Sequence, residues 1–165
     1  MKALQILLLV ACALQSAPVP SAPSITKAWS SPLLGRWSVD VARLPIPPEE
    51  RPRSVTITFR STDDGKLAMQ VDIVDAAGTA LNTGGSFSLD GTPEPAQGST
   101  FEADIGAAIS PAPNVLVLGL GKDGHPASTR VYTVAPNGKT MIETASSTSV
   151  DGKPRMRTNY FSRGK

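Results

Sequence analysis

Few side chains in this sequence are of the types that carry out catalysis. The single histidine, His125, lies in the run GLGKDGHP at residues 119–126. Its glycine spacing matches a dinucleotide-binding fingerprint, which works only where a helix follows directly and its N-terminus meets the pyrophosphate. Proline follows the histidine here and no helical pattern continues. We therefore predict a β-hairpin, and no nucleophile or base is spaced to use His125 in a Ser–His–Asp arrangement.

Two pairs of carboxylates have the spacing of a general acid and base: Asp72 with Asp75, and Glu102 with Asp104. Side chains two residues apart share a face of a strand, but we expect that face to be the solvated one. One histidine and one cysteine are also too few for an ordinary zinc site. The sequence therefore predicts no catalytic residues, no metal site, no cofactor and no enzymatic activity.

The only cysteine, Cys12, lies near the start of the chain. Lys2 precedes this cysteine, and an apolar run over residues 4–14 contains it, a pattern that is typical of a signal peptide. The apolar run is too short for a membrane span, which needs about 20 residues. Residues 9–12, Leu-Val-Ala-Cys, resemble the lipobox of bacterial lipoproteins, in which the cysteine is lipidated. We expect a signal peptide over residues 1–11, lipidation of Cys12 and a place on the periplasmic face of the cell envelope. The alternative is plain cleavage, which gives a soluble periplasmic or secreted protein.

After the cysteine, residues 12–31 are rich in Pro, Ser and Ala, a composition that predicts a flexible tether. Residues 32–165 then form one domain. The formal charge of the 165-residue chain is +2, with acidic and basic residues interspersed, so we expect no nucleic-acid binding. Contact with a membrane is expected through the lipid anchor only.

Turn signals recur along this domain and predict an all-β protein. Asp-Gly, Asn-Gly or Ala-Gly pairs at residues 64, 77, 90, 123, 137 and 151 are spaced as successive hairpins. The expected strands span residues 35–40, 53–60, 66–75, 79–89, 99–109, 114–120, 127–134, 139–150 and 153–162. Such an antiparallel up-and-down meander must hide its edges, so we predict a closed barrel of about eight to nine strands, with a β-sandwich as the alternative.

Alternation within the strands predicts which side chains face the core. Apolar residues alternate with polar ones at 55–59 and 69–73. The same reading puts Phe101, Ala103 and Ile105 inside in one strand, and Met156 and Tyr160 inside in the last.

The first strand opens with Gly35-Arg36-Trp37, which resembles the Gly-x-Trp start of lipocalins. That resemblance implies a tryptophan across the closed end of the barrel, under an arginine from a late strand, for which Arg155 or Arg157 are the candidates. The layout also resembles exported bacterial lipocalin-like proteins of unknown function: a proline-rich loop at residues 45–48, repeated Asp-Gly hairpins and Tyr160-Phe161 in the last strand.

Two functions fit these expectations. The first is a non-enzymatic cell-envelope binding module that holds a small apolar or amphipathic ligand, with Met69, Val71, Phe87 and Leu89 as lining residues. The alternative is a protein-interaction module, such as an inhibitor or immunity-type lipoprotein that masks an envelope protein. A cavity in the barrel would favour the ligand and a filled core the protein partner. We expect a monomer in either case.

Overall fold

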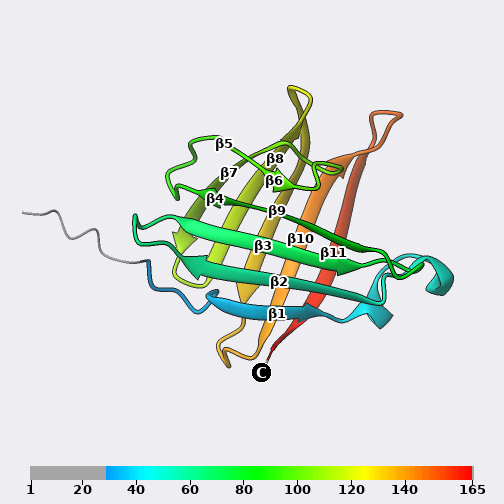
Figure 1. The fold of residues 1–165 in the computed structure, drawn as a ribbon, viewed down its shortest axis with the longest axis horizontal. Coiled ribbons are helices and arrows are strands. Elements are labelled where there is room, and N and C mark those ends of the chain that lie inside the picture. The colour runs from blue at the N-terminus through cyan, green and yellow to red at the C-terminus, as the bar shows by residue number, and fades with distance from the viewer. Residues whose placement is uncertain (1–28, 165) are drawn as a thin grey trace, which may run out of the picture.

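The computed structural model describes residues 29–164, which form an all-β, nearly closed barrel (Figure 1). The strands are β1 (Gly35–Val39), β2 (Ser54–Ser61), β3 (Leu67–Val74), β4 (Ala80–Phe87), β5 (Glu94–Pro95), β6 (Gln97–Gly98), β7 (Ile105–Ala112), β8 (Val115–Lys122), β9 (His125–Val134), β10 (Thr140–Thr148) and β11 (Pro154–Arg163). Two short 3-10 helices, η1 (Val41–Arg43) and η2 (Pro48–Glu50), follow β1. The expected signal peptide at 1–11, Cys12 and most of the expected tether lie outside the described residues.

All eleven strands belong to one antiparallel sheet in the order β5-β7-β8-β9-β10-β11-β1-β2-β3-β4-β6. The expected meander is confirmed, because neighbours in sequence pair through most of this order. The count of eight to nine strands was too low by the two-residue strands β5 and β6, which are too short to show an alternating pattern.

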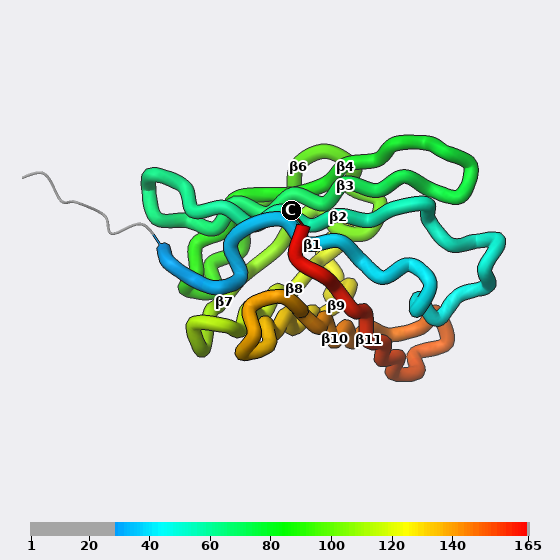
Figure 2. The backbone as a smooth tube through the Cα atoms, turned by 90° about the horizontal axis from the view of Figure 1, so that it is seen from below, coloured from blue at the N-terminus to red at the C-terminus, as the bar shows by residue number. Residues whose placement is uncertain are grey.

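The barrel is flattened into two layers. Figure 2 shows β1–β4 in one layer, here called the front sheet, and β7–β11 in the other, here called the back sheet. The strands of the two sheets run across each other in Figure 1. Hydrogen bonds join the two sheets where β1 pairs with β11, with Trp37 opposite Arg163.

On the opposite side, a seam separates the edges of β4 and β7, and residues 88–104 cross it. We expected a tight hairpin at Asp90-Gly91, but this segment instead pairs with both edges: β6 with β4, and β5 with β7. An isolated bridge also joins Asp90 to Ile109. We call residues 88–104 the strap, since they hold the barrel nearly closed.

The ring of Phe87 fills the inner side of this seam. It lies against Gly85 of β4 and Gly106 of β7, where an added Cβ would come within 2.5 and 2.8 Å of ring carbons. Only glycine permits so close an approach on both sides of the ring. Phe87 therefore seals the barrel where backbone pairing is incomplete.

The front sheet has the faces that alternation predicts. Ile57, Phe59 and Met69 are buried inside, while Arg60 and Gln70 lie on the outside. The prediction is confirmed for β2 and β3.

The back sheet reverses two of our predictions. Phe101 lies in the strap with 89% of its surface exposed, and Ile105 lies on the outer face of β7, where Gly106 and Ala108 point inward. In β11 the inward residues are Asn159 and Phe161, and not the expected Met156 and Tyr160. The expected strand at 99–109 begins only at Ile105, because residues 99–104 belong to the strap.

Candidate functional site

The closed end of the barrel is built on Trp37, which is fully buried. Its indole Nε1–H donates to the carbonyl of Leu33 at 2.7 Å, so the segment before β1 is held across this end. The guanidinium of Arg163 lies over the indole ring, 4.2 Å from its centroid, in a cation–π contact. The arginine that covers Trp37 is therefore Arg163, and not Arg155 or Arg157 as expected.

Arg163 also ties together three segments. It donates to the carbonyls of Leu34 at 2.8 Å, Pro32 at 2.5 Å and Gly138 at 2.6 Å. Gly35 has a φ of +117°, and a Cβ there would lie 2.9 Å from the guanidinium. The glycine of the Gly-x-Trp pattern is required because the backbone turns under the arginine.

Aromatic side chains fill the middle of the barrel. Phe59 on β2 and Tyr132 on β9 come from opposite walls, and their ring centroids lie 5.6 Å apart in an edge-to-face contact. Phe161 continues the contact, 6.4 Å from Tyr132. Because rings from opposite walls touch, the interior at this level is a packed core.

The four residues predicted to line a ligand cavity all lie in or against this core. Met69 and Phe87 are buried within it, and Val71 and Leu89 are partly buried and pack against it. Their apolar character is thus explained by the core. Val71 lies in one inward row with Ile57 and Trp37, which pair in register across β1, β2 and β3.

A polar cluster lies next to the aromatic core, around the buried carboxylate of Glu143. The carboxylate accepts hydrogen bonds from the hydroxyl of Tyr132 at 3.1 Å and from Nδ2 of Asn159 at 2.6 Å. Arg130 lies 3.5 Å from it and 2.6 Å from the more exposed Glu102. The Oδ1 atom of Asn159 is buried without a partner among the described residues.

The charges of this cluster support one another. Burial lowers the pKa of Arg130, but Tyr132, Glu102 and Glu143 outweigh this effect and raise it. Burial, with the Glu143 carboxylate, raises the pKa of the Tyr132 phenol. Arg130 is therefore always charged and Tyr132 always neutral, which fixes the phenol as a donor.

Beyond the polar cluster, the remaining inward positions differ between the two walls of the barrel. On β11, Arg157 and Arg155 follow Asn159 and Phe161 on the inward side, and both are exposed. Arg157 pairs in register with the buried Ala145, which in turn pairs with Arg130. Within the strands described, neither Arg155 nor Arg157 forms an ion pair with an acidic side chain.

On the front-sheet wall, the last inward positions are apolar. Val55, Ile73 and Leu81 form one row across β2, β3 and β4. Leu81 is 45% exposed and the other two are partly buried, so this row is accessible to solvent. At these positions the back-sheet wall thus carries two arginines and the front-sheet wall an apolar row.

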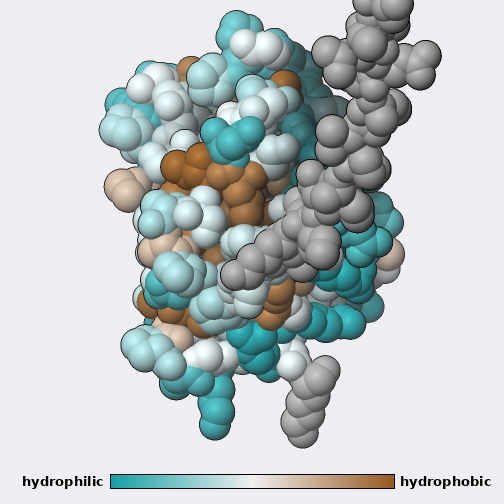
Figure 3. Space-filling view, turned by 90° about the vertical axis from the view of Figure 1, so that its left-hand side faces the viewer, coloured by the Kyte–Doolittle hydropathy of each residue, from teal (hydrophilic) through white to brown (hydrophobic). Residues whose placement is uncertain are grey.

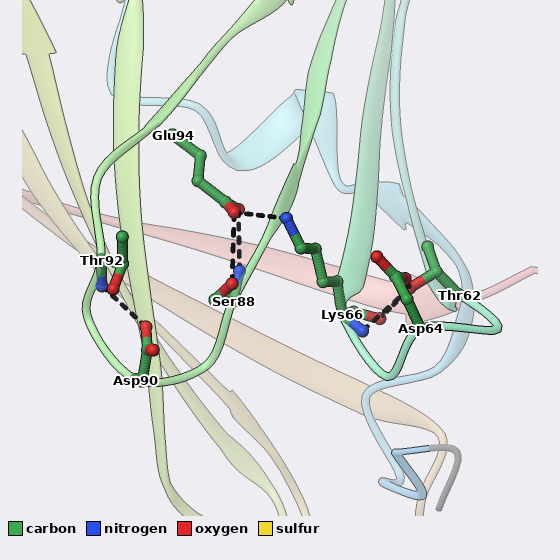
Figure 4. Close-up of polar contacts among 7 residues, drawn as sticks. All are labelled: Thr62, Asp64, Lys66, Ser88, Asp90, Thr92 and Glu94. Carbon is green, nitrogen blue, oxygen red and sulfur yellow. Dashed lines mark hydrogen bonds and ion pairs between the residues drawn. The ribbon is translucent and has the colours of Figure 1, made fainter. Parts of the chain in front are cut away.

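The carboxylates of the strap have structural partners. Glu94 accepts from Lys66 at 2.5 Å and from the backbone N–H of Ser88 at 2.8 Å, which ties the strap to the β2–β3 turn (Figure 4). Asp90 accepts from the N–H of Thr92, and the hydroxyl of Thr62 donates to Asp64 in the same view. The hydrogen bonds from Lys66 and Ser88 lower the pKa of Glu94. We assign this cluster to the stability of the strap.

The remaining chemical candidates are structural too. The 119–126 run forms the β8–β9 hairpin, and His125 is exposed at its end. Glu102 pairs with Arg130, and Asp104 accepts the backbone N–H of Asp123 at 2.9 Å. Over residues 29–164 no group of three or more metal-ligating side chains occurs. Among these residues no helix has the length and apolar character to cross a membrane.

No protein family matches the chain, and neither does any curated protein or solved structure.

Proposed function

We propose that the protein is a non-enzymatic binding module of the cell envelope, which holds a small amphipathic ligand in the open end of its barrel. The observation that carries this proposal is the contrast between the two walls: Arg155 and Arg157 on one side and Val55, Ile73 and Leu81 on the other. A molecule with an acidic head and an apolar tail matches both walls.

The packed core limits how deep this ligand goes. Phe59 and Tyr132 meet across the barrel, so an apolar tail cannot pass between the two sheets at their level. A guanidinium binds a carboxylate or phosphate through two parallel N–H donors, which suits the two arginines to the head group. The ligand is thus shallow and partly exposed, and we expect micromolar affinity.

A fluorescent long-chain fatty acid tests this proposal. Arg157→Gln and Leu81→Gln should each weaken its binding about tenfold, equivalent to about 1.4 kcal/mol. Arg60→Gln is the matched control, because Arg60 lies on the outer face of β2. Absence of saturable binding to the wild type, or equal loss in the Arg60 control, would contradict the proposal.

The place in the envelope rests on Cys12, which has a separate test. A clickable fatty acid fed to the cells should label the wild type and leave Cys12→Ser unlabelled. Equal labelling of both proteins would exclude lipidation at this position.

The packed core favours a second candidate, a protein-interaction module that masks an envelope protein. In that case affinity capture from envelope fractions should return one protein consistently, and organic extracts of the purified protein should contain no stoichiometric small molecule. Mass spectrometry of both fractions separates the two candidates.

A further inference from the structure

Among the residues that the structure describes, the outward positions of the back-sheet strands carry no charged side chain apart from Lys122 at the end of β8. Outward positions in the five described strands carry Ile, Val, Ala, Gly, Thr and Ser, with Pro154, Met156 and Tyr160 on β11. Lys122 is the last residue of β8, and its side chain forms an ion pair with Asp104. The charged residues that remain in these strands lie on inward positions: Arg130, Glu143, Arg155, Arg157 and Arg163.

The apolar residues of this face form continuous rows across the strands. The central row runs through Ile109, Val117, Val131, Thr144 and Thr158, each paired in register with the next. All five are β-branched, so the surface is stiff and even. Figure 3 looks at the left-hand side of Figure 1, where the edges of the two sheets lie, and shows hydrophobic side chains gathered at that edge.

Four large apolar side chains on this face are exposed to solvent. Ile105 and Ile109 on β7 are 39% and 42% exposed, Ile142 on β10 is 43% exposed and Met156 is 73% exposed. Thr and Ser lie between these residues on the same face, and large exposed apolar side chains gathered on one uncharged face mark a candidate interaction surface. The outer face of the front sheet, by contrast, carries Arg36 and Arg60.

We propose that this face binds a second copy of the chain, so that two back sheets pack face to face around a two-fold axis. In such a dimer, residues near the axis meet their own copies, and any charge there would meet a like charge. A face without charge avoids this repulsion for every position of the axis. The guanidinium of Arg43, 3.3 Å over the Tyr160 ring, marks the rim on the β11 side.

The size of the face sets the strength of the dimer. Five strands at about 4.8 Å spacing and outward residues over about 25 Å of strand give a footprint of roughly 500 Å² per copy. The total of roughly 1,000 Å² lies at the lower limit of specific interfaces, where association is weak and reversible. We therefore expect a dissociation constant in the micromolar range.

Sedimentation equilibrium of the full chain tests the dimer. The wild type should pass from monomer to dimer as its concentration rises, and Thr144→Arg, in the central row, should weaken association at least tenfold. Thr58→Arg is the matched control, since Thr58 lies on the outer face of β2 and is buried to a similar degree. Both variants keep residues 1–28. Association through that segment would therefore persist equally in the Thr144 and Thr58 variants.

A charge swap adds a second measurement. Thr144→Arg mixed with Thr144→Glu should restore association, because opposite charges then face each other. If Thr144→Arg does not fold, Ile142→Arg replaces it at an exposed position of the same strand. A chain that stays monomeric at about 100 µM, or that associates equally in the Thr144 and Thr58 variants, would overturn the proposal.

Discussion

The two sheets of this barrel place their charges on opposite sides. The front sheet has apolar residues such as Ile57 inside and Arg60 outside, whereas the back sheet has Arg130 and Glu143 inside and Val131 outside. An alternating strand shows which residues share a face, but not which face is buried. In the back sheet the buried Arg130 and Glu143 lie together inside. The outward positions of the described strands carry no charged side chain apart from Lys122 at the end of β8.

This difference divides the functions that we propose between the sheets. We propose that the inward arginines of the back sheet and the apolar row of the front sheet together bind an amphipathic ligand. The outer face of the back sheet is left for a protein surface. The front sheet supplies the core and the closed end.

The largest effect is expected at the closed end, where the two sheets are joined. Trp37→Ala should lower the free energy of unfolding by about 3 to 5 kcal/mol, because a fully buried ring is lost and Arg163 loses its contact. Urea unfolding measures this, with Trp29→Ala as the control, since Trp29 is only partly buried. A loss below about 1 kcal/mol would mean that Trp37 does not anchor the core.

The next largest effect is expected at the inner charges of the back sheet. Glu143→Met keeps the length of the side chain but removes the partner of Arg130, Tyr132 and Asn159. The cost should be about 3 kcal/mol, because buried donors are left unpaired. Glu102→Met removes the more exposed partner of Arg130 and should cost less than about 1 kcal/mol. Equal losses of unfolding free energy in the two variants would show that the buried Glu143 carboxylate is no more important for stability than the exposed Glu102.

A smaller, pH-dependent effect is expected at the strap. The pKa of Glu94 is lowered from its ordinary value of 4.5, so its contribution to stability is present above that value and is lost as the pH falls through the lowered pKa. Unfolding of wild type and Glu94→Gln should therefore differ at pH 6 and converge in acid below about pH 4.5. A difference that stays constant down to pH 3 would contradict this role.

The smallest effect on stability is expected at the unpaired arginines. Arg157→Gln should change the free energy of unfolding by less than about 0.5 kcal/mol, because its side chain is exposed and has no ion-pair partner among the described residues. Thermal unfolding measures it beside Arg60→Gln. A loss of unfolding free energy above about 1 kcal/mol would show that Arg157 has a structural role. Ligand binding would then not be needed to explain an arginine at this inward position.

Much of the fold is predictable from the sequence, and the site is less so. The hairpins at Asp64, Asp123, Asn137 and Asp151 follow from local turn chemistry. The strap does not, because Asp90-Gly91 has the same local signal while the chain beyond it pairs with two distant edges.

Side-chain partners also depend on register, which no local pattern gives. The arginine over Trp37 is Arg163 because β1 pairs with β11 at that level. Arg155 and Arg157 have the same alternation as Arg163, but they lie further along the strand, at the open end. The prediction of which β11 side chains point inward was wrong because it also depended on register. Tyr160 was predicted to lie in the core, but it lies on the outer face, where Arg43 covers its ring.

The reversed faces of the back sheet can be tested directly with thiol labelling. In a Cys12→Ser chain at submicromolar concentration, Ser146→Cys and Ala145→Cys put thiols on neighbouring residues of β10. Ser146 is exposed on the outer face and Ala145 is 6% exposed inside, beside Arg130. A maleimide should react with Cys at 146 at nearly the rate of a free thiol, and at least about a hundred times more slowly at 145, because a buried site reacts only after local opening. Equal rates, or faster reaction at 145, would contradict the placement of the charges inside the back sheet.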